Sequence, residues 1–114
     1  MSKRDEKIEA MIAEAKKLNL NISDDLIRKV VIGLGPSVYN KDSESVACSQ
    51  AKELETVREN FLKKKLGLSA DDAELDAAIK EVCEQLGASN RSKKRVHMYA
   101  LLAMKFNKES VYDA

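Results

Sequence analysis

The sequence predicts an all-α fold: a compact multihelical bundle of five main helices that forms a single helical domain over residues 1–114. Three observations support this prediction. Apolar residues recur at helical spacing in five segments, and glycines or the single proline stand close to the ends of several of them. No segment offers a convincing partner strand. The length of 114 residues suits one domain with a sizeable core.

The first predicted helix runs from about Lys3 to Leu18, with Ser2 placed to cap it. Its apolar stripe contains Ile8, Met11, Ile12, Ala15 and Leu18. The second helix lies in the stretch NISDDLIRKVVIGLG, where Ser23 is the expected N-cap and two aspartates follow at the positive end of the helix dipole. Its buried face contains Leu26, Ile27, Val30, Val31 and Leu34. The alternative for KVVIGLG is a strand that leads into a glycine turn.

The third predicted helix covers about Gln50 to Leu66, follows Ser49 and ends before Gly67, which suits a left-handed position after a helix. Its inward residues are Leu54, Val57, Phe61, Leu62 and Leu66. A fourth helix starts at Ser69 and is closed by Gly87. Its stripe is the most regular of the five and contains Leu75, Ala78, Ile79, Val82, Cys83 and Leu86.

A fifth helix is expected from about Asn90 to Phe106, and KESVYDA is expected to add a final turn. Its large apolar residues lie on almost every side: Val96, Met98, Tyr99, Leu101, Leu102 and Met104. Such a helix belongs in the middle of a bundle or at a subunit interface. The long connection from Gly35 to Ser49 is too apolar for an open linker, so we expect a packed loop with a short helical turn near Ser43.

Composition narrows the classes of function. Twenty Lys and Arg against nineteen Asp and Glu give a formal net charge of +1, so no global charge draws the chain to nucleic acid or to a membrane. The charged start, MSKRDEKIEAMIAEAKK, lacks the apolar run of a signal peptide, and no stretch has the length of an apolar membrane helix. The only cysteines, Cys48 and Cys83, fit no zinc or redox motif. We therefore expect a cytoplasmic protein with reduced thiols.

The stretch GLGPSVYN, residues 33–40, raises the question of a phosphate-binding loop. A dinucleotide loop would need a third glycine where Val38 stands, and a phosphate loop would need a Gly-Lys-Ser/Thr ending. Gly33 or Gly35 instead suits the end of a helix, and Pro36 prevents its continuation. The stretch is predicted to turn the chain.

The basic cluster Arg91, Lys93, Lys94 and Arg95 is the candidate site for an anion or a partner. On the expected fifth helix these residues occupy the first turns, where the helix dipole disfavours positive charge. They either pair with acidic neighbours, such as Asp71, Asp72 and Glu74, or bind an external anion. A helix-turn-helix reading fits poorly, because Lys93 falls where that motif needs an apolar residue.

Other reactive side chains have structural explanations. His97, the only histidine, has Lys93 and Leu101 four residues away, so we expect it to be packed or hydrogen-bonded within the bundle. Cys48 stands just before an expected helix start, and no base or second thiol can be assigned to it. No catalytic set, cofactor site or metal site is predicted, and we expect the chain not to be an enzyme.

Three blocks cover nearly the whole chain: IGLGPSVYNKDSESVACS, ELETVRENFLKKKLGL and LDAAIKEVCEQLGASNRSKKRVHMYALLAMKFNKESVY. In length and in the order of these blocks, the chain resembles a family of small uncharacterised bacterial proteins that is known only as a domain of unknown function. The resemblance implies a compact multihelical domain that self-associates, with no assigned activity, cofactor or catalytic residue.

Together these observations favour a small cytoplasmic protein that acts through protein–protein contacts as a homo-oligomer. The alternative is an accessory protein that binds nucleic acid or a phosphate ligand through the basic cluster. The near-zero net charge and the scarcity of aromatic residues, 4% of the chain, weigh against that alternative.

Overall fold

The computed structural model describes residues 3–35, 39, 45–87 and 93–112, and it confirms the all-α class. Its elements, in chain order, are α1 (Lys3–Lys17), α2 (Asp24–Leu34), α4 (Ala51–Thr56), the π-helix η2 (Val57–Lys65), α5 (Asp72–Gln85), α6 (Arg95–Lys105) and the 3₁₀ turn η3 (Glu109–Tyr112). Within these ranges the only β pairing is an isolated bridge between Ser45 and Lys94.

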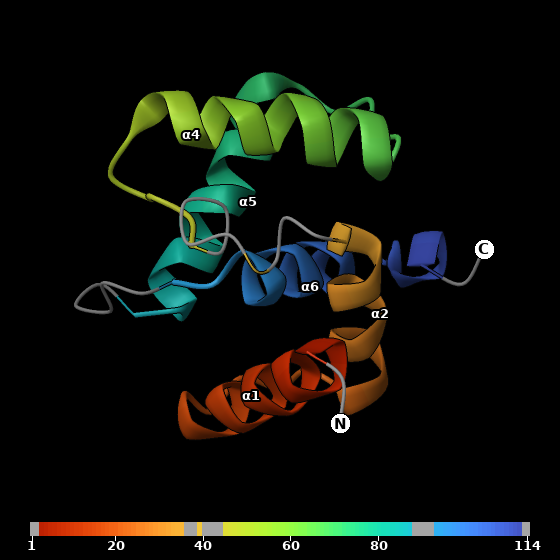
Figure 1. The fold of residues 1–114 in the computed structure, drawn as a ribbon. Helices are drawn as coiled ribbons and strands as arrows, with labels where there is room; N and C mark the ends of the chain where they lie inside the picture. The colour runs from red at the N-terminus through yellow and green to blue at the C-terminus, as the bar shows by residue number, and fades with distance from the viewer. Residues whose placement is uncertain (1–2, 36–38, 40–44, 88–92, 113–114) are drawn as a thin grey trace.

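Helix α6 lies at the centre of the molecule. Helices α4 and η2 form one layer and α1 forms the opposite one, with α6 between them (Figure 1). Helix α6 packs against α1, α2, α5 and η3. Its buried residues are Val96, His97, Met98, Ala100, Leu101, Leu102 and Ala103. The apolar residues on all its sides therefore predicted its position correctly, and they belong to a core shared with the other helices.

The second predicted helix is confirmed with both of its caps. The hydroxyl of Ser23 accepts a hydrogen bond of 3.1 Å from the backbone N–H of Leu26, which satisfies one of the open donors at the start of α2. Gly35 ends α2 with a positive φ of 63°, a conformation that suits glycine. Thus KVVIGL is helical through Leu34, and Gly35 ends the helix, as one of the two glycines was expected to do.

The third predicted helix differs from the expectation in its second half. Only Ala51–Thr56 are α-helical, and Val57–Lys65 form a nine-residue π-helix. The wider turn continues past its end, where the N–H of Leu66 donates to the carbonyl of Phe61 over 2.9 Å. At the junction, the Thr56 hydroxyl donates to the Lys52 carbonyl, a contact that often bends helices. Apolar spacings of four and five residues between 57 and 66 let this wider helix keep one buried face.

Two other helices begin later than the sequence predicts. Helix α5 starts at Asp72 with Asp71 as its N-cap, not at Ser69, and helix α6 starts at Arg95, not at Asn90. The late start of α6 is caused by a tertiary contact. Lys94 has extended backbone angles, and the N–H of Val46 donates to the Lys93 carbonyl over 2.8 Å. Pairing with residues 45–46 holds the chain extended up to the first residue of α6.

The connection between α2 and α4 is partly packed. Val46 is buried and Cys48 is half-buried, whereas Tyr39 is 43% exposed. The helical turn expected near Ser43, like the Ser2 cap and Pro36, lies outside the described residues. Cys48 and Cys83 form a disulfide, so the expectation of reduced thiols is wrong for this structure. The bond joins the segment before α4 to α5.

None of the helices in the described ranges combines the length and the apolar composition that crossing a membrane requires.

The central position of α6 leads to a test of the core. Leu102 is fully buried on α6, so Leu102→Ala removes apolar contacts that no other side chain can replace. We expect the free energy of unfolding, measured with urea, to fall by about 2–5 kcal/mol. A loss below about 0.5 kcal/mol, which is usual for surface substitutions, would contradict this packing.

Candidate functional site

The basic cluster predicted from the sequence is divided by the structure. Arg91 lies outside the described residues. Lys93 and Lys94 belong to the extended segment that pairs with residues 45–46, and Arg95 is the first residue of α6. Of the three described residues, Arg95 alone stands in the helix itself, so among them the unfavourable dipole position inferred for the cluster applies to that residue.

Lys94 is directed into the molecule. Its side chain is 10% exposed, and its Nζ lies 3.6 Å from Oε1 of Glu14 on α1. A buried ammonium group needs such a partner, because transfer of an unpaired charge out of water is very costly. The Lys94–Glu14 ion pair joins the start of α6 to α1.

Arg95 joins α6 to the opposite layer. Its guanidinium forms an ion pair and a hydrogen bond with the Glu53 carboxylate on α4, and it donates to the Ser45 carbonyl. It also donates to the Tyr99 hydroxyl over 3.2 Å, and the Tyr99 ring stacks on Phe61 of η2 with centroids 3.9 Å apart. Burial by itself would lower the pKa of Arg95, but the contacts with Tyr99 and Glu53 outweigh it and raise the pKa.

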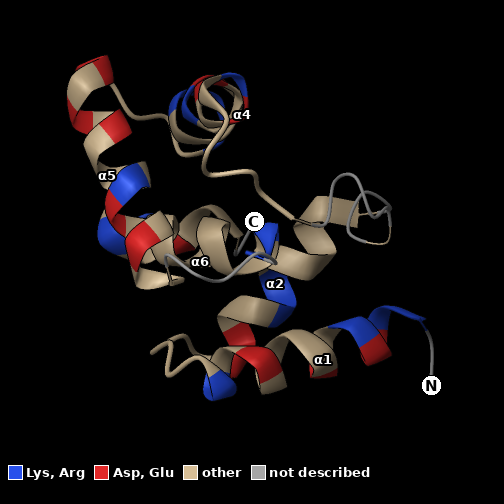
Figure 2. Cartoon of the chain, turned by 90° about the vertical axis from the view of Figure 1, so that its left-hand side faces the viewer, with Lys and Arg blue, Asp and Glu red and all other residues tan. Residues whose placement is uncertain are grey.

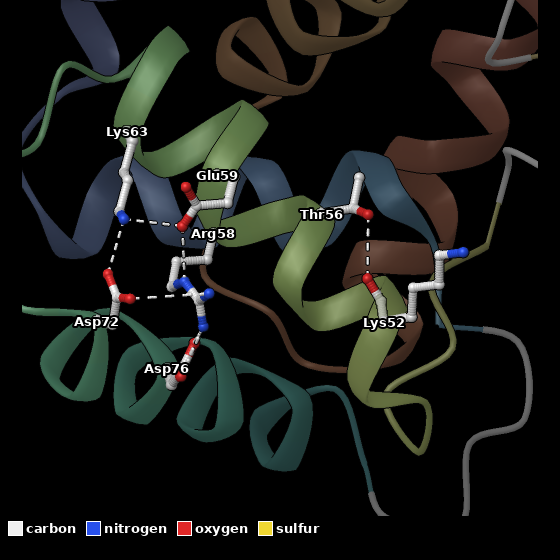
Figure 3. Close-up of polar contacts among 7 residues, drawn as sticks. All are labelled: Lys52, Thr56, Arg58, Glu59, Lys63, Asp72 and Asp76. Carbon is white, nitrogen blue, oxygen red and sulfur yellow. Dashed lines mark hydrogen bonds and ion pairs between the residues drawn. The ribbon is translucent and has the colours of Figure 1, made fainter.

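Of the acidic residues expected beside the cluster, Asp72 has other partners. Asp72 and Asp76 at the start of α5 pair with η2, not with the basic cluster (Figure 3). Arg58 donates to both oxygens of Asp76 over 3.0 Å and to Glu59 over 2.9 Å. Lys63 bridges Glu59 at 2.8 Å and Asp72 at 2.7 Å, and its hydrogen bond lowers the pKa of Asp72. This exposed network fastens η2 to α5.

The surface distribution of charge matches this mutual pairing. Acidic and basic residues both occur along α1 and along α5 (Figure 2). The i, i+4 ion pair between Asp25 and Lys29, 3.1 Å long, continues the pattern on α2. Surface pairs of this kind contribute little to stability individually. Lys94 and Arg95 differ from them because their charges are largely buried.

His97 is fully buried on α6, as the sequence led us to expect. Its Nε2 lies 2.9 Å from the Met11 carbonyl, which can only accept, so Nε2 carries the hydrogen. Nδ1 then has no hydrogen-bond partner and lies 3.8 Å from Oε2 of Glu14. Burial lowers the pKa of His97 below its usual value, the Met11 carbonyl and Glu14 raise it in part, and Lys94 lowers it further.

A small hollow lies at the C-terminal end of α2. Its volume is ≈170 Å³, and its lining is Gly33, Leu34, Asn60, Phe61, Lys65, Tyr99 and Tyr112. Lys65 Nζ stands 5.2 Å from the centre of the Tyr112 ring, and burial raises the pKa of the Tyr112 phenol. The neighbouring side chain of Ile32 is 48% exposed. Ile32 precedes Gly33 in the last turn of α2, so an exposed apolar side chain and a largely apolar hollow both belong to this end of the helix.

A larger hollow of ≈430 Å³ lies between α4 and α5. Its lining is Cys48, Ala51, Leu54, Glu55, Arg58, Asp76 and Lys80. A further hollow of ≈430 Å³ lies between the start of α2 and the end of α6, lined by Ser23, Asp25, Lys29, Met104 and neighbouring residues. Within the described ranges, no three His, Cys, Asp or Glu side chains are grouped as they would be to hold a metal ion.

Comparison of the sequence with known protein families identifies one that matches this chain. Residues 9–110 match the family described as "Protein of unknown function (DUF2853)". The chain belongs to this family. The match covers most of the sequence and every element from α2 to α6, so the resemblance inferred from the three sequence blocks is confirmed at the level of the family. No curated protein matches the chain.

Sequence reasoning located the basic residues but not their partners. Glu14 and Glu53 lie far from residues 94–95 in the chain, and no local spacing connects them. The hollow beside Cys48 was also missed, because it forms between two helices that meet only in the folded chain. For the disulfide a signal did exist in the sequence: Cys48 and Cys83 are the only two cysteines, so each is the only possible intramolecular partner of the other.

The buried histidine predicts a dependence of stability on pH. The folded-state pKa of His97 lies below the unfolded value near 6.5, so the unfolded chain binds a proton that the folded chain excludes. The contribution of neutral His97 to the free energy of unfolding is fully present above pH 6.5, and it is lost as the pH falls below this value. We expect the free energy of unfolding to decline there by up to about 1.4 kcal/mol per pH unit, the limit for one proton.

The matched variant is His97→Gln, which keeps a side-chain N–H for the Met11 carbonyl and cannot titrate. Urea unfolding of both proteins between pH 8 and pH 5 isolates the effect of His97, because the lowered pKa of Asp72 acts only at lower pH. An equally steep decline in His97→Gln would contradict the assignment.

Proposed function

We propose that this protein acts through protein–protein contacts, as a homo-oligomer whose subunits meet at the C-terminal end of α2. The observation that carries the proposal is that exposed Ile32 and the hollow lined by Leu34, Phe61, Tyr99 and Tyr112 both belong to this end of α2. Ile32 and Tyr39 are the large apolar side chains that stand exposed among the described residues. Exposed apolar groups beside a hollow are typical of interaction sites.

A second copy of the chain is the occupant that this face fits. In a twofold dimer, the same patch serves both subunits, so a protruding side chain and a receiving hollow must lie close together on one surface. Ile32 adjoins Gly33, which lines the hollow, and Tyr39 follows the end of α2 by only a few residues. Aromatic residues such as Tyr99 and Tyr112 are enriched in the centres of protein interfaces.

The end of α2 serves for contact between subunits and not for catalysis. His97 is fully buried, and the single N–H of its neutral ring donates to the Met11 carbonyl. The ring therefore does not reach a substrate at the surface. The expectation that the chain is not an enzyme stays a prediction, as does its cytoplasmic location.

The contact surface is tested by Ile32→Lys. Ile32 is exposed, and a cation in the last turn of α2 suits the helix dipole, so the variant is expected to fold normally. We expect the wild-type protein at micromolar concentration to scatter light as a dimer or larger, and Ile32→Lys to scatter as one 12.7 kDa chain. Ala10→Lys, at an exposed position of α1, is the control and is expected to leave the assembly intact. A wild-type protein that stays at 12.7 kDa throughout this range would refute the proposal.

The alternative, binding of nucleic acid or phosphate by the basic cluster, is weakened by the internal ion pairs of Lys94 and Arg95. We expect a mixed-sequence duplex and a single-stranded RNA to bind only in the non-specific range, about 10⁻⁴ to 10⁻⁶ M. Binding is measured at two salt concentrations, with Lys93→Ala as the comparison. A nanomolar, salt-sensitive complex that Lys93→Ala weakens would establish the alternative.

A further inference from the structure

The disulfide between Cys48 and Cys83 is open to the surface on one side only. Cys48 is half-buried and lines the ≈430 Å³ hollow between α4 and α5. Cys83 lies on the inner face of α5, is 8% exposed and does not line the hollow. A molecule that enters this hollow therefore meets Cys48 and not its partner.

The hollow has the size and the chemistry of a small-molecule site. Its volume falls within the range of about 300–1,000 Å³ that is usual for such sites. Ala51 and Leu54 supply apolar wall, and Lys80 on α5 supplies an exposed ammonium group. Arg58 is held in place by Asp76, so the guanidinium is a fixed part of the wall. Glu55 and Asp76 add carboxylates to the same lining, so the hollow presents charges of both signs, and a small zwitterionic peptide that carries a thiol matches it.

We propose that Cys48 is a site of thiol–disulfide exchange, at which a small peptide thiol enters the hollow between α4 and α5 and forms a mixed disulfide. Exchange proceeds by attack of a thiolate on one sulfur of a disulfide, and access decides which sulfur is attacked. The position of the two cysteines selects Sγ of Cys48.

The exchange is balanced without an external oxidant. The thiolate forms a bond with Sγ of Cys48, the bond between Cys48 and Cys83 breaks, and its electron pair passes to the sulfur of Cys83. The Cys83 thiolate then takes a proton from water. One disulfide replaces another, and a second peptide thiol can later release Cys48 as a thiol and leave as the oxidised dimer of the peptide.

The modification would change how the segment before α4 is joined to α5. In the starting state the disulfide ties the segment before α4 to α5, and the network around Arg58 ties η2 to the same helix. After exchange the covalent tie is absent, and a peptide occupies the space between α4 and α5. The site is separate from the end of α2, so this inference does not depend on the proposed self-association.

The test uses the full-length protein in its disulfide form, with reduced glutathione as the probe. Samples are quenched with acid at intervals, and the site of the adduct is mapped by mass spectrometry of peptides. We expect the glutathione adduct on Cys48, with a rate that rises linearly with glutathione concentration, as attack on the folded protein requires. An adduct on Cys83, or a rate that does not depend on glutathione, would overturn the proposal, because either result means that the bond is reached through unfolding.

A matched pair of variants tests the route of entry. Ala51→Trp places a large side chain at an exposed position of the lining, and Ala10→Trp makes the same change on α1. We expect Ala51→Trp to slow adduct formation by about tenfold or more through loss of access, and Ala10→Trp to react as the wild type does. Equal rates for the two variants, with unchanged circular dichroism, would show that the thiol does not enter through this hollow.

Discussion

The burial of α6 on all its sides is the constraint on which the rest of the structure depends. A helix whose apolar residues face every direction is stable in water only when other elements surround it. Here α1, α2, α5 and η3 pack against it. The layer of α4 and η2 adds Phe61, which stacks on Tyr99 of α6. The other helices are thus placed where they cover the apolar surface of α6.

The same constraint explains the unusual placement of charge. Because α6 starts inside the bundle, the charged residues at its start cannot remain in water, and each needs a partner within the protein. Lys94 finds Glu14 on one layer and Arg95 finds Glu53 on the other. The two ion pairs reach in opposite directions from one end of α6. They give the layers a defined register, which apolar contacts alone specify less strictly because they are non-directional.

The sequence predicted those parts of the fold that local patterns encode. The stripes of α1, α2 and α5, the Ser23 cap and the Gly35 terminus follow from spacing and backbone chemistry within a few residues. The start of α6 was misplaced because the pairing of residues 93–94 with residues 45–46, far away in the chain, holds Lys94 extended. The π-helix was missed because the spacings of four residues from Val57 to Phe61 and from Leu62 to Leu66 also suit an α-helix. The basic cluster was found, but its partners, like the hollow beside Cys48, depend on tertiary contacts that no local pattern records.

Gly33 lowers the local stability of α2 but allows a contact with Tyr112, which is distant in the sequence. A glycine inside a helix costs about 0.5–1 kcal/mol relative to alanine. At this position, however, a methyl group would stand 3.2 Å from a ring carbon of Tyr112, closer than such contacts normally are. The C-terminal turn η3 therefore packs against the backbone of α2 at Gly33, where no side chain intervenes. Substitution by alanine would favour α2 and disfavour the docking of η3 at once, so this position couples the folding of α2 to the order of the C-terminal segment.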